Sequence, residues 1–582
     1  MAVDPALARS PLFADLAEAE LEAVAERMRP RSFAEGEEIC HAGEPSDRTW
    51  IITGGLVHWL APTPEGGGEF TLRMRKGEVI GAQDALIGAP RSATVVAAIP
   101  TTALELDAEE LSDVARRFPQ ILLNVINTQR ERMIRASVRR AAKKRGEEVA
   151  LLAGPSLKDA LAWLAAAARS ATPRPATVLD RRLSVAGALT ASDELLSESA
   201  TVLILGELDT KTLGVLFDEV DRVVAFAGTA GEVELLGDFA GAEGGQLEIV
   251  LVGGEAEATH RSWRPEAKRL VIRTCEREDG FPLSNSDLAW LARHVTRTKL
   301  GLALGAGGAK GYAHVGALGV LEEAGYTVDY IGGSSIGGFV STQIALGYSA
   351  SEIDERFRSA FDADLVGALF SGPFGGGSAG RDALTGMLKR ITEERWFSDS
   401  VIPLMIMAVD LTDRAPYPQR EGPLWEALLA ALSVAGVFPP QERNGHRLVD
   451  GLALVPVPTA SVLEDGADVV VSVNLMSAET LDRWPDGPEP EEAPAKKKGI
   501  LDTILEVMDL SQLDTSIRHA ALADVVITPR FGPADWREFQ LADLFLAAGR
   551  TAALEQLPAL QSLSTPVDLD VSRRETVLGA FV

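Results

Sequence analysis

The sequence predicts a multidomain protein: an N-terminal β-roll followed by helices over residues 1–152, a middle α/β domain over 153–296 and a C-terminal α/β domain over 297–582. Three observations support this fold class. The length of 582 residues far exceeds a single domain of about 100–200 residues. Short, glycine-punctuated strands dominate the region up to Leu106. Beyond residue 200, apolar runs of strand length alternate with helical segments, as in parallel sheets.

The composition excludes several classes of protein. Hydrophobic residues make up 46% and charged residues 24% of the chain, which argues against a largely disordered or coiled-coil protein. The 84 acidic and 56 basic side chains leave a formal charge of −28. We therefore expect no nucleic-acid partner, and this charge repels anionic bilayer surfaces.

Cysteines, histidines and the N-terminus indicate the compartment. Cys40 and Cys275 lie far apart, which predicts no disulfide framework and favours a reducing environment. The seven histidines show no metal-ligand spacing, so no metal site is expected. Residues 1–16 do not resemble a signal peptide, and no run of about 18 apolar residues occurs. We expect a cytoplasmic protein without a transmembrane span, whose contact with the inner membrane face is at most peripheral.

The N-terminal region changes its hydrophobic period twice. Apolar residues recur at helical spacing over 13–28, and runs such as 35–39 and 50–57 then predict short strands of a small antiparallel barrel or jelly roll. From Asp107 to Leu152 the period returns to 3.6, which predicts long helices. Their apolar stripe consists of Leu111, Val114, Phe118, Leu122, Val125 and Ile126.

The middle region begins with an alanine-rich stretch over 156–182, which predicts a helix and a linker. Continuous apolar runs follow over 200–206, 221–226, 246–252 and 270–273. Such runs are typical of strands buried on both faces of a parallel sheet. No glycine fingerprint follows these strands, so we expect no dinucleotide in this domain.

The C-terminal region continues the alternation, with a further buried-strand run over 468–473. Residues 484–498 interrupt it with prolines, acidic residues and three consecutive lysines. This composition favours a flexible surface loop over a specific lid or anchor.

A serine flanked by glycines, Gly333-Ser334-Ser335-Ile336-Gly337, follows the strand-like run 328–331 and precedes a helix expected over 338–345. A sharp strand-to-helix turn leaves no room for side chains around an exposed serine hydroxyl, which explains glycine at positions 333 and 337. The pattern predicts a nucleophilic Ser335. A purely structural turn is the alternative.

A glycine-rich loop separates the strand-like run 300–304 from a helix expected over 312–325. Its glycines allow backbone N–H groups to converge at a helix N-terminus, where an anion is favoured. In acyl transfer that anion is the tetrahedral oxyanion. A dinucleotide phosphate and a close-packed turn are the other interpretations of this loop, Gly305-Ala306-Gly307-Gly308-Ala309-Lys310-Gly311.

An aspartate and a glycine, Asp450 and Gly451, follow the short apolar run 448–449. Taken alone, they predict only an ordinary Asp-Gly turn.

Together and in this order, the three elements resemble the patatin-like phospholipase family over residues 299–560, including the segment 433–440. The resemblance implies Ser335 as nucleophile, Asp450 as its base and no cofactor for catalysis. Ala306 and Leu452 depart from the family's pattern, which concerns the shape of the loops and not the reacting groups. The residues of the implied oxyanion loop are Gly307, Gly308, Lys310 and Gly311.

A carboxylate with an ordinary pKa is a poor base for a serine hydroxyl. We therefore expect the helix N-terminus to acidify Ser335 and a dry site to hold Asp450. No catalytic histidine is then needed. A Ser-His-Asp triad is the alternative and would require a histidine after the serine, which leaves His446 and His519.

Residues 76–95 resemble the phosphate-binding cassette of cyclic nucleotide-binding domains, as in catabolite activator proteins. Arg91 lies ten positions after Gly81, as the family's phosphate-binding arginine does. The resemblance implies a cyclic nucleotide as regulator, with Ser92 and Ala93 also near its phosphate. Ala82 replaces the family's ribose-binding glutamate, which predicts weak or absent binding of cyclic AMP. A roll kept for docking or dimerisation is the alternative.

Basic residues cluster on the helix expected after the roll, which favours a solvated face paired with acidic partners over contact with phospholipid headgroups. They are Arg130, Arg132, Arg135, Arg139, Arg140, Lys143, Lys144 and Arg145.

The order of the three regions resembles the bacterial relatives of neuropathy target esterase. It implies a serine hydrolase that removes acyl chains from phospholipids or lysophospholipids through an acyl-enzyme, regulated by its N-terminal domain. The rival interpretation is a nucleotide-responsive regulatory or scaffold protein with a non-catalytic patatin-like domain. No signature of an oligomeric state is present.

Overall fold

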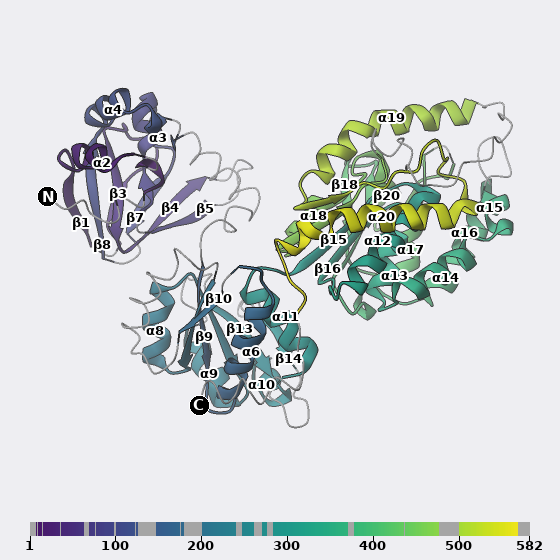
Figure 1. The fold of residues 1–582 in the computed structure, drawn as a ribbon, viewed down its shortest axis with the longest axis horizontal. Coiled ribbons are helices and arrows are strands. Elements are labelled where there is room, and N and C mark those ends of the chain that lie inside the picture. Colours follow the sequence, from purple (N-terminus) through teal and green to yellow (C-terminus); the bar gives the residue numbers. More distant parts are fainter. Residues whose placement is uncertain are drawn as a thin grey trace. The chain divides into compact units, whose positions relative to one another are not determined.

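The structure is a computed structural model that describes residues 7, 10–13, 16–62, 69–125, 147–179, 201–239, 247–260, 271–275, 283–369, 377–476 and 500–567, apart from 35, 76, 98, 99, 123, 175 and 436. The chain divides into two compact units, Met1–Ala142 and Lys143–Val582 (Figure 1). The expectations for the basic cluster at 130–145 and the insertion at 484–498 lie outside the described residues.

The N-terminal unit is a β-roll of two antiparallel four-stranded sheets, ordered β1-β8-β3-β6 and β2-β7-β4-β5. Apolar residues of its strands, such as Ile51, Val57 and Val95, are buried in two clusters between the sheets and the helices that cover them. The expected roll is confirmed. Its strands are β1 (Arg29–Phe33), β2 (Glu38–Cys40), β3 (Arg48–Gly54), β4 (Leu56–Pro62), β5 (Glu69–Arg75), β6 (Val79–Ile80), β7 (Thr94–Ala97) and β8 (Thr101–Asp107).

The helices of this unit are shorter than the sequence predicts. They are α2 (Glu18–Ala25), α3 (Ala82–Ile87) and α4 (Ala108–Arg117). Leu111 and Val114 of α4 are buried in the core, as expected. The helical stretch expected from residue 107 onward is interrupted rather than continuous. Helix α4 ends at Arg117 because Phe118 precedes Pro119, and a residue before proline is disfavoured in helical conformation. Residues 120–122 and 124–125 are helical again.

The middle region contains a six-stranded parallel sheet of order β10-β11-β9-β12-β13-β14. The prediction of a helix up to residue 152 is wrong, because residues 149–152 lie in β9, inside this sheet. The expected boundary at 152 therefore falls within a strand, and the expected linker contains β10. The strands are β9 (Glu147–Ala153), β10 (Ala176–Leu179), β11 (Thr201–Glu207), β12 (Arg222–Ala227), β13 (Leu247–Val252) and β14 (Val271–Cys275).

Helices cover both faces of this middle sheet, as the continuous apolar strands predict (Figure 1). One face packs against α6 (Lys158–Ser170) and α11 (Asn285–Val295). The other packs against α8 (Thr210–Glu219), α9 (Ala230–Phe239) and α10 (Gly254–His260).

The C-terminal region is built on a sheet of order β19-β20-β17-β16-β15-β21-β22, with β18 also beside β17. Strands β15, β16, β17, β21 and β22 run parallel, whereas β18, β19 and β20 pair in antiparallel fashion. The bounds are β15 (Leu300–Leu304), β16 (Tyr330–Ser334), β17 (Leu404–Asp410), β18 (Ala415–Gln419), β19 (Gln441–Arg443), β20 (His446–Asp450), β21 (Val469–Val473) and β22 (Val525–Ile527).

Helices enclose this sheet too. The hydrophobic core on one face contains residues of α12 (Tyr312–Glu323), α13 (Ile336–Ala345), α14 (Ala350–Ala360), α16 (Gly377–Thr392), α17 (Leu424–Ala431) and α20 (Ala542–Gln561). The other face packs against α18 (Thr459–Glu464) and the end of α19 (Ile500–Ala520). No helix among the described residues combines the length and apolar character needed to cross a bilayer.

A buried ion pair ties the middle region to the C-terminal sheet. The guanidinium of Arg293, on α11, donates hydrogen bonds of 2.8 and 2.7 Å to the two carboxylate oxygens of Asp329. Oδ2 of Asp329 also accepts the N–H of Leu300 at 2.9 Å. Since Asp329 immediately precedes β16 and Leu300 begins β15, this contact fixes the starts of the two strands that lead to the candidate site.

Candidate active site

The glycine-flanked serine forms a strained elbow at the end of β16. Ser335 has backbone angles φ +53° and ψ −124°, in a region that costs a non-glycine residue about 1–3 kcal/mol. A Cβ on Gly333 would lie 2.2 Å from the carbonyl of Gly337, and a Cβ on Gly337 would lie 2.2 Å from the carbonyl oxygen of Leu304. Both flanking positions therefore require glycine, and the elbow leads directly into α13.

Ser335 and Asp450 form a hydrogen-bonded pair, the candidate dyad. The hydroxyl of Ser335 donates to Oδ2 of Asp450 at 2.7 Å. Oδ1 of Asp450 accepts the N–H of Leu452 at 2.8 Å, and the N–H of Asp450 donates to the carbonyl of Ser433 at 3.0 Å. The exposed fractions of Ser335 and Asp450 are 7% and 3%, so the pair is nearly dry.

Burial raises the pKa of Asp450 to about 7, although the hydrogen bonds from Ser335 and from the N–H of Leu452 favour the charged form. A carboxylate with this pKa is well matched to proton transfer near neutral pH. The dry site therefore gives Asp450 the basicity that an exposed carboxylate lacks.

Gly451 allows the strand that carries Asp450 to reach the elbow. Strand β20 pairs with β17 so that Asp450 lies opposite Ala408, and β16 pairs with the preceding residues of β17 so that Ser334 lies opposite Met407. Because β18 occupies the other edge of β17, β16 and β20 meet end to end along one edge. A Cβ on Gly451 would lie 2.6 Å from Oγ of Ser334 and 2.8 Å from the carbonyl oxygen of Met407. A larger residue at 451 would push Asp450 away from Ser335.

The glycine-rich loop presents two main-chain donors. The N–H of Ala309 donates to the carbonyl of Trp536 at 2.6 Å, and that of Lys310 donates to the carbonyl of Gly307 at 3.2 Å. Within the described parts of the chain, the N–H groups of Gly307 and Gly308 meet no acceptor. These two groups can hold an oxyanion, whereas the main-chain N–H of Lys310 is already engaged.

Close packing sets the shape of this loop. Gly308 has φ +57°, and a Cβ there would lie 2.4 Å from the carbonyl oxygen of Trp536. A Cβ on Gly311 would lie 2.6 Å from Cγ1 of Ile336, the residue after the nucleophile. Gly311 therefore lets the loop approach the elbow, and Lys310 places its ammonium 5.5 Å from the ring centroid of Phe531.

His314 contacts the glycine-rich loop, although the sequence predicts no functional role for this residue. It is fully buried on α12, and its Nε2 lies 2.8 Å from the carbonyl oxygen of Gly305. Burial lowers its pKa to about 4, so the neutral ring donates this hydrogen bond through Nε2–H. The only sequence signal was one polar residue among the apolar residues of α12.

In the predicted nucleotide cassette of the N-terminal unit, the Arg91 side chain packs against the protein itself. A Cβ on Gly81, which has φ +75°, would lie 1.8 Å from Nη1 of Arg91, so the guanidinium is tucked directly against this glycine. Nη2 of Arg91 donates to the carbonyl of Arg48 at 2.6 Å, and the guanidinium carbon lies 5.0 Å from the ring centroid of Trp50. Only 4% of the Arg91 surface is exposed.

Ser92 and Ala93 complete the cassette. Ala93 is buried, and both the N–H and the hydroxyl of Ser92 donate to Asp84. The structure therefore brings the four predicted residues together, with the donors of Ser92 engaged inside the protein.

Models of two known families match parts of this chain. The model of the patatin-like phospholipase family matches residues 302–463, which contain the glycine-rich loop, Ser335 and Asp450. The chain carries a patatin-like phospholipase domain. The model of the cyclic nucleotide-binding domain matches residues 30–118, so the β-roll is such a domain.

Relatives of this chain match it well beyond the patatin-like domain. The chain is 24% identical to an uncharacterized NTE family protein of Mycobacterium tuberculosis, over 96% of this chain and 97% of that protein. It is also 24% identical to mouse patatin-like phospholipase domain-containing protein 6, over 77% of this chain and 38% of that protein. Among solved structures, the catabolite activator protein of Thermus thermophilus matches 27% of this chain and 69% of its own, with 25% identity and a TM-score of 0.21.

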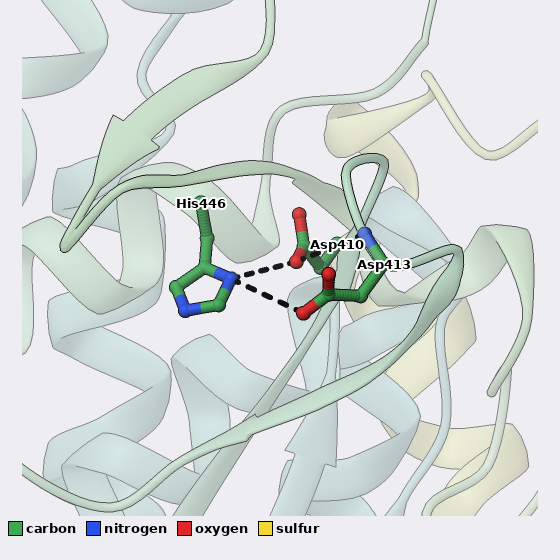
Figure 2. A group of neighbouring side chains, drawn as sticks. All are labelled: Asp410, Asp413 and His446. Carbon is green, nitrogen blue, oxygen red and sulfur yellow. Dashed lines mark hydrogen bonds and ion pairs between the residues drawn. The ribbon is translucent and has the colours of Figure 1, made fainter.

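The histidines of the triad alternative lie elsewhere in the patatin-like domain. Figure 2 shows His446 beside two aspartates: its Nδ1 lies 2.7 Å from Oδ2 of Asp410 and 3.7 Å from Oδ2 of Asp413. His519 lies at the end of α19. Neither histidine forms a hydrogen bond with Ser335 or Asp450 in the described part of the chain.

The three side chains of Figure 2 have ligand atoms within 4.8 Å of one another, a spacing that a metal ion could bridge. Both oxygens of Asp410 are already engaged, however, by main-chain N–H groups and by His446. Although burial favours the neutral acid, the N–H of Thr412 and the ring of His446 hold the pKa of Asp410 well below its usual range. We interpret the cluster as a structural contact that holds the end of β17 against the start of β20, the strand that carries Asp450.

Proposed function

We propose that this protein is a serine hydrolase that removes acyl chains from phospholipids or lysophospholipids. The hydrogen bond of 2.7 Å between Ser335 and Asp450, inside a matched patatin-like phospholipase domain, carries this proposal. The strained backbone of Ser335 and the two available N–H groups of the loop supply the other parts that acyl transfer needs.

In the first half-reaction, Oγ of Ser335 attacks the ester carbonyl while its proton passes to Oδ2 of Asp450. The N–H groups of Gly307 and Gly308 hold the resulting oxyanion, and one such donor contributes about 3 kcal/mol to the transition state. The bond to the alcohol then breaks, the alcohol oxygen takes the proton from Asp450, and the acyl group stays on Ser335.

In the second half-reaction, Asp450 accepts a proton from water, whose oxygen attacks the acyl carbonyl. The second tetrahedral intermediate collapses, and Oγ of Ser335 leaves with the proton held by Asp450. The fatty acid is released and the dyad returns to its starting state. One group thus serves as base and then as acid in each half-reaction, which suits a pKa of about 7.

The charge of the chain favours particular forms of this substrate. A formal charge of −28 opposes docking to anionic bilayers, so lysophospholipid monomers and zwitterionic surfaces are the expected sources of ester. We place this activity in the cytoplasm, with peripheral access to the inner membrane face and with regulation through the N-terminal domain.

Hydrolysis of a panel of lysophospholipids and phospholipids by purified wild type and Ser335→Ala tests the proposal. We expect the wild type to release fatty acid and Ser335→Ala to lose nearly all of this activity. Full activity in Ser335→Ala would overturn the assignment. A folded wild type that is inactive on the whole panel would support the scaffold alternative.

A further inference from the structure

We infer that Asp84 is an internal competitor for the anion site of the cyclic nucleotide-binding domain. Its carboxylate lies where Ser92 presents two hydrogen-bond donors side by side. The N–H and the hydroxyl of Ser92 both donate to Oδ2 of Asp84, at 3.0 Å each. A main-chain and a side-chain donor that converge on one oxygen also suit an oxygen of a phosphate group.

Arg91 shows that the same cassette still has the means to bind an anion. The residue is 96% buried, given its exposed fraction of 4%, and its Nη1 has no hydrogen-bond partner among the described residues. Buried charges are normally paired, because desolvation of an isolated charge is costly. Within the described residues no carboxylate lies within 4.0 Å of the Arg91 guanidinium, so its positive charge is uncompensated at close range.

The occupied donors of Ser92 and the charge of Arg91, unpaired within the described residues, together imply that Asp84 and a phosphate compete for this cassette. Arg91 and Ser92 are consecutive, and the donors that Ser92 would offer to a phosphate are already occupied by Asp84. A phosphate bound there would bring its negative charge next to the Asp84 carboxylate, and like charges at short range repel. The absent ribose contact at Ala82 weakens binding of the sugar, whereas Asp84 weakens binding of the phosphate itself. The Asp84 carboxylate therefore occupies donors of the cassette that a phosphate would need. Removal of this carboxylate should make the donors of Ser92 available to a phosphate.

Titration calorimetry of the full chain with cyclic AMP, cyclic GMP and inorganic phosphate tests this inference. We expect Asp84→Ala to bind at least one of these probes ten-fold or more tightly than the wild type. Asp84→Asn keeps an acceptor but loses the charge, so its affinity should lie between the two. Asp113→Ala is the matched control, since it removes an exposed acid of the same domain without touching Ser92. Its affinity should equal that of the wild type.

Circular dichroism and thermal unfolding of each variant report whether the N-terminal unit has folded, because Asp84 lies in Met1–Ala142 and the candidate dyad lies in the other unit. If Asp84→Ala does not fold, the comparison of Asp84→Asn with the wild type decides. The inference is overturned if folded Asp84→Ala or Asp84→Asn binds every probe no better than the wild type. It is equally overturned if Asp113→Ala gains the same affinity, because a general charge effect would then explain the result.

Discussion

Ser335 and Asp450 meet where two strands end on the same edge of β17: β16 ends just before Ser335, opposite Met407, and β20 ends at Asp450, opposite Ala408. The hydrogen bond of 2.7 Å between them is thus set by the sheet and by the absence of side chains at Gly333, Gly337 and Gly451. A dyad on rigid strands needs little reorganisation before the reaction, which is what preorganised catalysis requires.

The pH dependence of hydrolysis should follow Asp450. Only the ionised carboxylate accepts the proton of Ser335, and burial raises its pKa to about 7. We expect kcat/KM for a soluble ester to rise with pH through an apparent pKa of about 7 and to level off above it. A profile that is flat between pH 5 and pH 9, measured with buffers of constant ionic strength, would contradict this assignment.

Asp450→Asn should lose activity and gain stability. Loss of the base should lower kcat by about 10²–10⁴-fold. Because the folded-state pKa is raised, the folded protein binds more protons than the unfolded chain between about pH 4 and pH 7. The contribution of protonated Asp450 to the free energy of unfolding is therefore fully present below pH 4 and is lost as the pH rises to 7.

At pH 8 the buried charge of Asp450 costs up to about 4 kcal/mol, since one pKa unit corresponds to about 1.4 kcal/mol. Asparagine carries no charge, so denaturant unfolding at pH 8 should show a higher free energy of unfolding for Asp450→Asn than for the wild type. At pH 4 the two proteins should be nearly equal. Equal stability at both pH values would argue against a buried, ionised Asp450.

His314→Leu should impair the oxyanion loop without affecting substrate binding. Leucine leaves the carbonyl of Gly305 without its donor, so we expect kcat to fall about 10-fold or more while KM stays within about two-fold, a loss of about 1–3 kcal/mol. His314→Gln can place an amide N–H near the position of Nε2 and should recover part of kcat. Steady-state kinetics that show a change in KM alone, or no recovery by glutamine, would rule out this positioning role.

Gly308→Ala tests the loop directly. A Cβ there would collide with the carbonyl of Trp536, at a residue that already has φ +57°. The displaced donor should lower kcat by about 10²-fold or more, as loss of one oxyanion donor does elsewhere. Gly386→Ala is the matched control, because a Cβ at this position of α16 meets nothing within 4 Å. Comparable kcat values for the two variants would show that the loop holds no oxyanion.

The sequence predicts the strands and motifs that carry strong local signals. The strand-like runs at 300–304 and 468–473 appear as β15 and β21, because such apolar runs suit strands buried on both faces. For the run in β9 the sequence predicts a helix, since periodicity cannot separate a short buried strand from a buried helix. Only its partners, β11 and β12, make it a strand.

The candidate dyad was accessible to sequence analysis because both residues sit in glycine-marked turns. The roles of His314 and Asp84 could not be predicted from the sequence. The role of His314 depends on its contact with Gly305, and that of Asp84 depends on its contact with Ser92. Both contacts follow from tertiary packing. Arg91 shows the same limit: its spacing from Gly81 was clear, but the direction of its guanidinium depends on Trp50 and Arg48.

Mass spectrometry of the protein after treatment with a fluorophosphonate probe tests the central claim most directly. The account predicts one covalent phosphonyl adduct on the peptide that contains Ser335, slower labelling in Asp450→Asn and none in Ser335→Ala. A folded wild-type protein that remains unlabelled, or a protein labelled at another serine with Ser335 unmodified, would contradict it.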